Sequence, residues 1–160
     1  MKCPKFISNV LKPFSCGMLI GCLCLTSTPI YSNASASTEG NRKYVTVNNV
    51  QFTMYNSADT LKLNNKKYAY ASTTVTAEQM LQAGFLGAEP ILYYSNGNVA
   101  FHGELTYSSD NSGTYSGVTS ISGFTDSPAV YSCGYAYIWN GINYHIKYQP
   151  DKTGNLSNYT

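Results

Sequence analysis

Charged residues are scarce in this 160-residue chain, because Asp, Glu, Lys and Arg make up only 11% of it and the formal net charge is +2. A disordered chain combines high charge with few aromatic residues, whereas aromatic residues here reach 14%. A coiled coil is rich in Glu, Lys, Ala and Leu, and a nucleic-acid-binding domain carries a strongly basic patch. The composition therefore favours one β-rich globular domain and argues against a nucleic-acid partner.

Long apolar runs are also missing, apart from a short one near the N-terminus. Residues Phe14–Leu25 are mostly apolar, but this run of about 12 residues is shorter than the ~20 that span a bilayer. Basic residues precede it, and the small residues Ala34-Ser35-Ala36 follow it. This order is typical of a secretory signal peptide with an A-x-A cleavage site. We expect residues 1–36 to be a signal peptide cleaved after Ala36, which leaves no stable membrane span in a secreted, extracellular mature chain.

A second interpretation of the leader starts from Leu19-Ile20-Gly21-Cys22, which resembles a bacterial lipobox. Cys22 would then be the lipid-bearing first residue of an anchored lipoprotein. The residues after Cys22 stay apolar, whereas a lipoprotein tether is polar and flexible. We therefore favour the cleaved signal peptide and keep the lipoprotein as the alternative.

Cysteine nearly disappears from the mature chain, because four of the five cysteines lie in the leader. Cys133 remains alone, so no intramolecular disulfide can staple the domain. Its neighbours are strand-forming residues, which predicts a buried structural thiol, with an intermolecular disulfide as the alternative. Cleavage also removes three of the ten basic residues and leaves seven against eight acidic residues, so attraction to anionic membranes or phosphates is weak.

The mature chain shows alternating apolar and polar residues interrupted by Asn and Gly pairs, which is typical of strands and hairpin turns. The pairs are Asn48-Asn49, Asn64-Asn65, Asn96-Gly97 and Asn140-Gly141. We expect an all-β domain over residues 44–150, an antiparallel β-sandwich or small barrel of about seven or eight short strands. Residues 37–43 are expected to be frayed and residues 151–160 to form a flexible tail. Thr76–Gly84 has capping-box spacing for a short helix, with a loop as the alternative.

Catalytic signatures are also lacking. The chain has no G-x-S-x-G elbow, S-x-x-K motif, P-loop or dinucleotide fingerprint. His102 and Glu104 share the polar face of one predicted hairpin strand, and His145 and Lys147 share that of another. If the two hairpins lay side by side, these groups would form a crude metal site or acid/base pair. Solvent-facing strand residues explain them better, so we predict no catalytic residue, no metal and no cofactor.

Tyrosine is what the chain has in abundance, with 15 residues against a single Trp. Large residues alternate through Tyr131, Cys133, Tyr135, Tyr137 and Trp139, a set that we call the aromatic stripe. A stripe of period two normally marks the buried face of a strand, so we expect it to face the core. The alternative is an exposed platform, since Tyr with Ser, Asn and Gly is the chemistry of rigid binding surfaces. Of the adjacent pair Tyr93-Tyr94, at least one ring faces outward, because neighbouring side chains on a strand point to opposite sides.

Two segments, AGFLGAEPILYYSNG (Ala83–Gly97) and YSCGYAYIWNGINYH (Tyr131–His145), resemble uncharacterised small secreted Gly/Tyr-rich β proteins of Gram-positive bacteria. The resemblance implies export and a β-sandwich but no active site. We expect a secreted, non-catalytic binding module that contacts a protein or glycan at or near the bacterial envelope. The candidate binding residues are His102, Glu104, His145, Tyr94 and Trp139. The alternatives are a bacteriocin-like or toxin-like effector and, third, a small hydrolase using His102, Glu104 or His145.

Overall fold

A long hairpin forms the spine of the protein in the computed structural model, which describes residues 36–109, 116–142 and 145–157. Strands β3 (Val50–Leu63) and β4 (Lys66–Ala77) pair along their whole length. Asn64 and Asn65 join them with φ angles of 49° and 63°. Asn tolerates this left-handed conformation, and two such residues match the twist of a hairpin turn.

The first layer of the fold is built around this hairpin. Strand β2 (Lys43–Val47) turns into β3 through Asn48 and Asn49, whose φ angles are again positive. Strand β1 (Ser37–Glu39) pairs with β3 further along the chain, and β9 (Ser116–Ile121) pairs with β4. The strand order is β1-β3-β4-β9, with β2 also paired to β3. The predicted Asn turns are confirmed.

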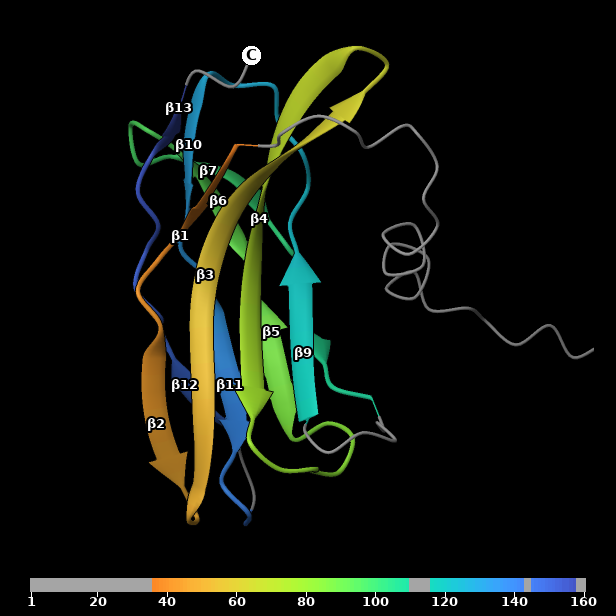
Figure 1. The fold of residues 1–160 in the computed structure, drawn as a ribbon, viewed down its shortest axis with the longest axis vertical. Helices are drawn as coiled ribbons and strands as arrows, with labels where there is room; N and C mark the ends of the chain where they lie inside the picture. The colour runs from red at the N-terminus through yellow and green to blue at the C-terminus, as the bar shows by residue number, and fades with distance from the viewer. Residues whose placement is uncertain (1–35, 110–115, 143–144, 158–160) are drawn as a thin grey trace, which may run out of the picture.

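The second layer consists of two four-stranded antiparallel sheets, which lie behind β3 and β4 in Figure 1. One has the order β13-β10-β6-β7 and the other β12-β11-β5-β8. Their strands are β5 (Leu86–Glu89), β6 (Ile91–Tyr94), β7 (Val99–His102), β8 (Thr106–Tyr107), β10 (Ala129–Ser132), β11 (Tyr135–Trp139), β12 (His145–Tyr148) and β13 (Leu156–Ser157). The β6–β7 and β11–β12 pairs confirm the two Asn-Gly hairpins.

A row of Pro and Gly residues separates the two sheets of the second layer, and we call it the break line. It comprises Pro90, Gly103, Gly134 and Pro150. Pro90 lies between β5 and β6, where its missing N–H interrupts the ladder. Gly134 lies beside it between β10 and β11, and an added Cβ there would come 2.9 Å from Pro90 Cα. Two consecutive strands therefore belong to different sheets on each side of the break line, β5 and β6 in one case and β10 and β11 in the other.

The core lies between the two layers in two clusters. In the first, Phe52, Met54 and Val75 of the first layer meet Leu86 and Ile138 of the second. In the second, the first layer contributes only alanines, Ala58, Ala69 and Ala71, opposite Leu92 and Val130. The predicted all-β sandwich is confirmed, and the sheets do not close into the alternative barrel. Among the described residues there is no helix that is long and apolar enough to cross a bilayer.

Two local expectations differ from the structure. The described ranges contain thirteen strands rather than seven or eight, because the break line divides strands that look continuous in sequence. No helix forms at Thr76–Gly84: β4 continues to Ala77, and Glu78 N–H bonds to the Gln51 carbonyl at 3.2 Å. Pairing with β3 therefore prevails over the capping-box signal, and the loop alternative is correct.

Both ends of the expected domain are also more ordered than we expected. The frayed segment 37–43 instead contains β1, in which Ser37 lies opposite Asp59 of β3. The tail 151–160 includes Thr153 and Leu156, which are buried, and β13 pairs with β10. Short polar segments of this kind are held by neighbours far away in sequence, which a local pattern does not reveal. Residues 1–35 of the leader and residues 158–160 of the tail lie outside the described residues.

Candidate functional site: an outward tyrosine face

The aromatic stripe faces away from the core. Tyr131, Cys133, Tyr135, Tyr137 and Trp139 are half-buried on the outer side of the second layer. The residues between them point inward and are buried, namely Val130, Ser132, Gly134, Ala136 and Ile138. The expectation that the stripe forms the core face is therefore wrong, and the alternative of an outer platform is correct.

The narrow gap between the layers explains this orientation. A Cβ added at Gly134 would lie 2.1 Å from Thr73 Oγ1 and 2.4 Å from the Glu89 carbonyl oxygen. The Asn56 side chain, which lies opposite, is completely buried. Its Nδ2 donates to the Pro150 carbonyl and its Oδ1 accepts from the Gly134 N–H. Because interiors are close-packed, no space remains there for a phenol ring. Ser132, Gly134 and Ala136 therefore face inward at this point, and the tyrosines face outward.

The rings on this outer side are held against one another and against lysine. Tyr93 and Tyr131 are cross-strand partners, and their rings stack with centroids 5.1 Å apart at 8°. Lys147 Nζ lies 3.6 Å from the centroid of Tyr135 and 5.4 Å from that of Tyr137. Such cation–π contacts each contribute about 0.5–1 kcal/mol at exposed sites. We call Tyr93, Tyr131, Tyr135 and Tyr137 the tyrosine face.

Glu89 of β5 is the carboxylate beside the tyrosine face, and three groups converge on it. His102 Nε2 donates to Oε1 at 2.7 Å, the Tyr137 hydroxyl donates to Oε2, and Lys147 Nζ lies 3.8 Å from Oε2. Burial raises the pKa of Glu89, but the bonds from Tyr137 and His102 and the charge of Lys147 outweigh it and hold the pKa below its ordinary value. The negative charge of Glu89 is thus compensated by its partners, and the carboxylate joins His102, Tyr137 and Lys147.

The pKa values of Tyr137 and Lys147, which contact Glu89, are shifted in the opposite direction. Burial, followed by the hydrogen bond to Glu89, raises the pKa of Tyr137. Interaction with the Tyr137 hydroxyl is the main cause of a raised pKa at Lys147. Burial, with the neighbouring Cys133 and tyrosines, raises the pKa of Tyr93. At neutral pH these phenols therefore remain protonated and present hydroxyl groups.

The structure does not bring His102, Glu104 and His145 together into the cluster that we considered as the less favoured hypothesis. His102 pairs with Glu89 and not with Glu104, which is exposed and contributes its backbone carbonyl to Ser120 Oγ at 3.0 Å. His145 instead donates from Nε2 to the Gly84 carbonyl at 2.7 Å. The described residues contain no group of three His, Cys, Asp or Glu that could hold a metal. Neither histidine is hydrogen-bonded to a hydroxyl or thiol in that part of the chain.

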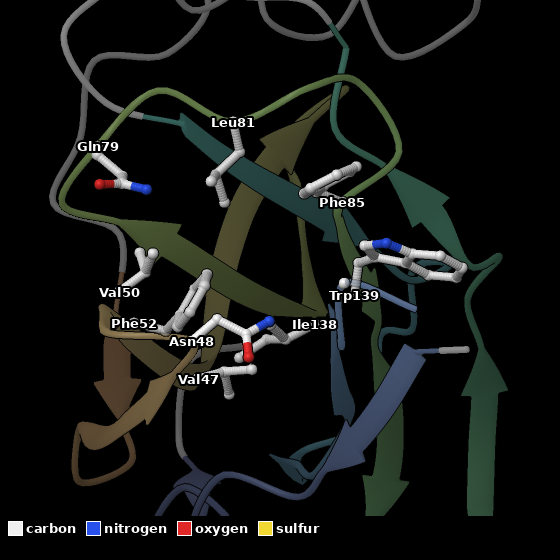
Figure 2. Close-up of a pocket in the computed structure, with 10 residues that line it drawn as sticks. Val47, Asn48, Val50, Phe52, Gln79, Leu81, Phe85, Ile138 and Trp139 are labelled. Atoms are coloured by element: carbon white, nitrogen blue, oxygen red, sulfur yellow. The ribbon is translucent and has the colours of Figure 1, made fainter. Parts of the chain in front are cut away.

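The other two candidate residues lie at different ends of the fold. Tyr94 is half-buried and packs against the second core cluster. Trp139 ends the aromatic stripe, with its ring 6.3 Å from Phe85 and 5.2 Å from His145 between centroids. Trp139 also lines a pocket of about 240 Å³ at the end of the sandwich where the β2–β3 turn, the β4–β5 loop and the β11–β12 turn meet. Figure 2 shows this pocket, with Trp139 at one side of it beside Phe85.

Cys133 belongs to the outer side and not to the core. It is half-buried between Tyr131 and Tyr135 in sequence, and Gln149 Nε2 donates to its Sγ at 3.1 Å. The expectation of a buried structural thiol is therefore corrected. The same alternation that turns the tyrosines outward turns this thiol outward.

Sequence patterns did not identify Glu89, Tyr93 and Lys147 as part of this site. Tyr93 meets Tyr131 only through the β6–β10 pairing, and Glu89 lies opposite Tyr135 only through the β5–β11 pairing. Lys147 was noted for its shared face with His145 but not for the tyrosines that it covers. The one local signal was the Tyr93-Tyr94 pair, of which one ring had to face outward.

No protein-family model and no curated protein matches this chain. Among solved structures, the chain is similar to one described as the X-ray structure of Northeast Structural Genomics Consortium target SoR45. The two share 15% identity, with 79% of this chain and 88% of that chain covered, at a TM-score of 0.36. A likeness at this level carries no conclusion about function.

Proposed function

We propose that this protein is an exported, non-catalytic binding module that recognises another protein at or near the bacterial envelope through its tyrosine face. The observation that carries the proposal is the outward stripe, because it places large aromatic side chains at the surface of a rigid sheet. Tyr is enriched where proteins bind one another, since it supplies contact area and a hydroxyl at low cost in conformational entropy.

The orientation of the rings favours a protein over a glycan. A sugar stacks on an open ring face, but here Tyr93 and Tyr131 cover one another. Lys147 lies over Tyr135 and Tyr137, and Lys152 Nζ lies 5.5 Å from the Tyr131 centroid. At least one face of each of these rings is therefore in contact with another side chain of the protein, which leaves less open ring surface for a sugar. Phenol rings suit the mixed apolar and hydrogen-bonding contacts of a protein interface.

The tyrosine face is also fixed before any partner arrives. Ring stacking, the lysine contacts and the hydrogen bonds on Glu89 hold Tyr93, Tyr135 and Tyr137 in place. A preorganised surface loses little side-chain freedom on association, so more of its contact energy appears as affinity. Export and cleavage after Ala36 are part of this proposal. They are supported by the order of basic, apolar and small residues in residues 1–36.

The test is capture of a partner from the envelope fraction of the organism that encodes the chain, using the secreted protein and two variants. The double variant Tyr131→Ser, Tyr135→Ser removes the centre of the tyrosine face. Its control, Tyr44→Ser, removes a ring that is 60% exposed on β2 in the opposite layer. We expect the double variant to bind the captured protein at least tenfold more weakly and the control to bind it unchanged.

Other outcomes would reject the proposal. If the wild-type protein and the double variant capture the same proteins equally, the tyrosine face is not the binding surface. Saturable binding on a glycan array that is lost in the double variant would make the ligand a sugar instead. Killing of neighbouring strains by the purified protein, equal in all variants, would favour the effector function.

A further inference from the structure

The pocket at the end of the sandwich is built by three loops that are tied to one another. Asn48 Nδ2 in the β2–β3 turn donates to the Asn140 carbonyl in the β11–β12 turn at 2.9 Å. In the β4–β5 loop, the Phe85 carbonyl accepts from Trp139 N–H at 2.8 Å, and Gly84 N–H bonds to the Ser108 carbonyl at 2.8 Å. Hydrogen bonds within the chain therefore position the walls of the pocket.

The lining of this pocket is apolar and uncharged. Its walls are the side chains of Val47, Val50, Phe52, Leu81, Phe85 and Ile138 together with Trp139, and its polar residues are Asn48 and Gln79. Figure 2 shows Leu81, Val50 and Phe52 facing the same space. The amide nitrogen of Asn48 is already used by Asn140. Because none of the described residues that line it is charged, the pocket suits an uncharged apolar group.

The size of the pocket limits the occupant to one side chain or a group of similar size. A dry cavity of about 150 Å³ holds benzene, and this pocket measures about 240 Å³. A Leu, Ile, Met or Phe side chain fits that volume. Next to the lining residues along the chain, Met80 is 56% exposed and Ile142 is 80% exposed.

Trp139 connects the pocket to the tyrosine face, because it is both the last residue of the aromatic stripe and part of the pocket lining. A protein lying along the stripe would therefore reach the pocket without leaving the surface. The residues that dominate the binding energy of a protein interface cluster in well-packed, desolvated pockets. We propose that the pocket receives one uncharged apolar side chain of the protein bound by the tyrosine face, an inference that rests on the proposed function.

The test reads the pocket directly through Trp139, the only Trp in the chain. N-acetyl-leucinamide and N-acetyl-phenylalaninamide are titrated into the isotope-labelled secreted protein, with N-acetyl-glycinamide as the probe that lacks a side chain. We expect a saturable shift of the Trp139 indole N–H resonance for the first two probes only. Val50→Phe fills the pocket and should weaken this binding at least tenfold, whereas Val99→Phe, at a site 53% exposed on β7, should leave it unchanged.

The same variants are then used in partner capture. Val50→Phe should also weaken capture of the partner at least tenfold. If thermal unfolding shows that Val50→Phe does not fold, Leu81→Phe, which narrows the pocket from the loop side, is used in its place. Absence of a saturable shift in the wild type would overturn the proposal. Probe binding with partner capture unaffected by Val50→Phe would also overturn it, because the pocket would then serve a free small molecule. Capture unaffected by Tyr131→Ser, Tyr135→Ser instead rejects the proposed function, so the two failures are separate results.

Discussion

The side-chain oxygen of Asn56, buried between the two layers, accepts a hydrogen bond of 3.0 Å from the backbone N–H of Gly134. The same oxygen accepts from Thr73 Oγ1 at 2.7 Å, and Asn56 Nδ2 donates to the carbonyls of Pro150 and Asp151 at 3.2 and 3.1 Å. One amide therefore joins the first layer to the break line of the second. It also keeps the layers close at the point where the aromatic stripe turns outward.

Replacing Asn56 with Ala should destabilise the protein by about 3 kcal/mol. The substitution removes the Asn56 partner of the Gly134 N–H, of the Pro150 carbonyl, which is buried, and of the Asp151 carbonyl, which is partly buried. Each unsatisfied buried group costs about 1–3 kcal/mol. Urea unfolding measures the free energy. The control Asn155→Ala removes an exposed amide and should change stability by less than about 0.5 kcal/mol. Equal small effects from both variants would show that the Asn56 bonds do not hold the layers together.

Gly134 should not tolerate even one added carbon. A Cβ there would meet Thr73 Oγ1, the Glu89 carbonyl and Pro90 Cα at 2.1 to 2.9 Å, and two of those three atoms belong to the backbone and yield little. We expect Gly134→Ala to cost at least about 2 kcal/mol through overpacking. Gly154→Ala is the matched control, since its nearest contact is an ordinary 3.5 Å to Thr38 Oγ1. If the two variants melt at the same temperature, the interlayer gap is wider than described.

Glu89 should make the protein sensitive to acid. Its pKa is held below the ordinary value in the folded state, so its stabilising contribution is present above the unfolded pKa of about 4.3. That contribution is lost as the pH falls through the folded pKa. The stability difference between wild type and Glu89→Gln should therefore shrink as the pH falls from 7 to below 4. Glu104→Gln, at an exposed site, is the control. A stability difference between wild type and Glu89→Gln that does not depend on pH would show that the Glu89 carboxylate does not stabilise the fold through its partners.

The proposed cleavage after Ala36 predicts a mature protein that begins at Ser37, at the start of β1. The Ser37 hydroxyl donates to Asp59, whose other oxygen accepts from Ser57 Oγ at 2.6 Å. The new α-ammonium group would therefore appear on the strand facing Asp59. Intact-mass measurement of the secreted protein should give residues 37–160. A lipid-modified chain starting at Cys22 would instead establish the lipoprotein.

Much of the fold was predictable because its determinants are local. Asn48-Asn49 and Asn64-Asn65 specify tight turns by their tolerance of positive φ, and alternation marks the flanking strands. The short strands β1 and β13 were not predictable, because Ser37–Glu39 and Leu156–Ser157 have weak local patterns and depend on pairing with β3 and β10.

The candidate site was predictable only in part. The stripe from Tyr131 to Trp139 was visible in the sequence, but its direction depends on the space opposite Gly134, which Asn56 and Thr73 determine from another layer. An alternation of period two shows that the two faces of a strand differ, but it does not show which face is buried. Glu89 likewise joins the site only through its sheet partner Tyr135.

The most direct test of the central claim is hydroxyl-radical footprinting of the tyrosines, with and without the captured partner. We predict that Tyr93, Tyr131, Tyr135 and Tyr137 are modified in the free protein and protected in the complex, whereas Tyr44 on the opposite layer is modified equally in both. Protection of Tyr44 with no change at the tyrosine face would contradict the account.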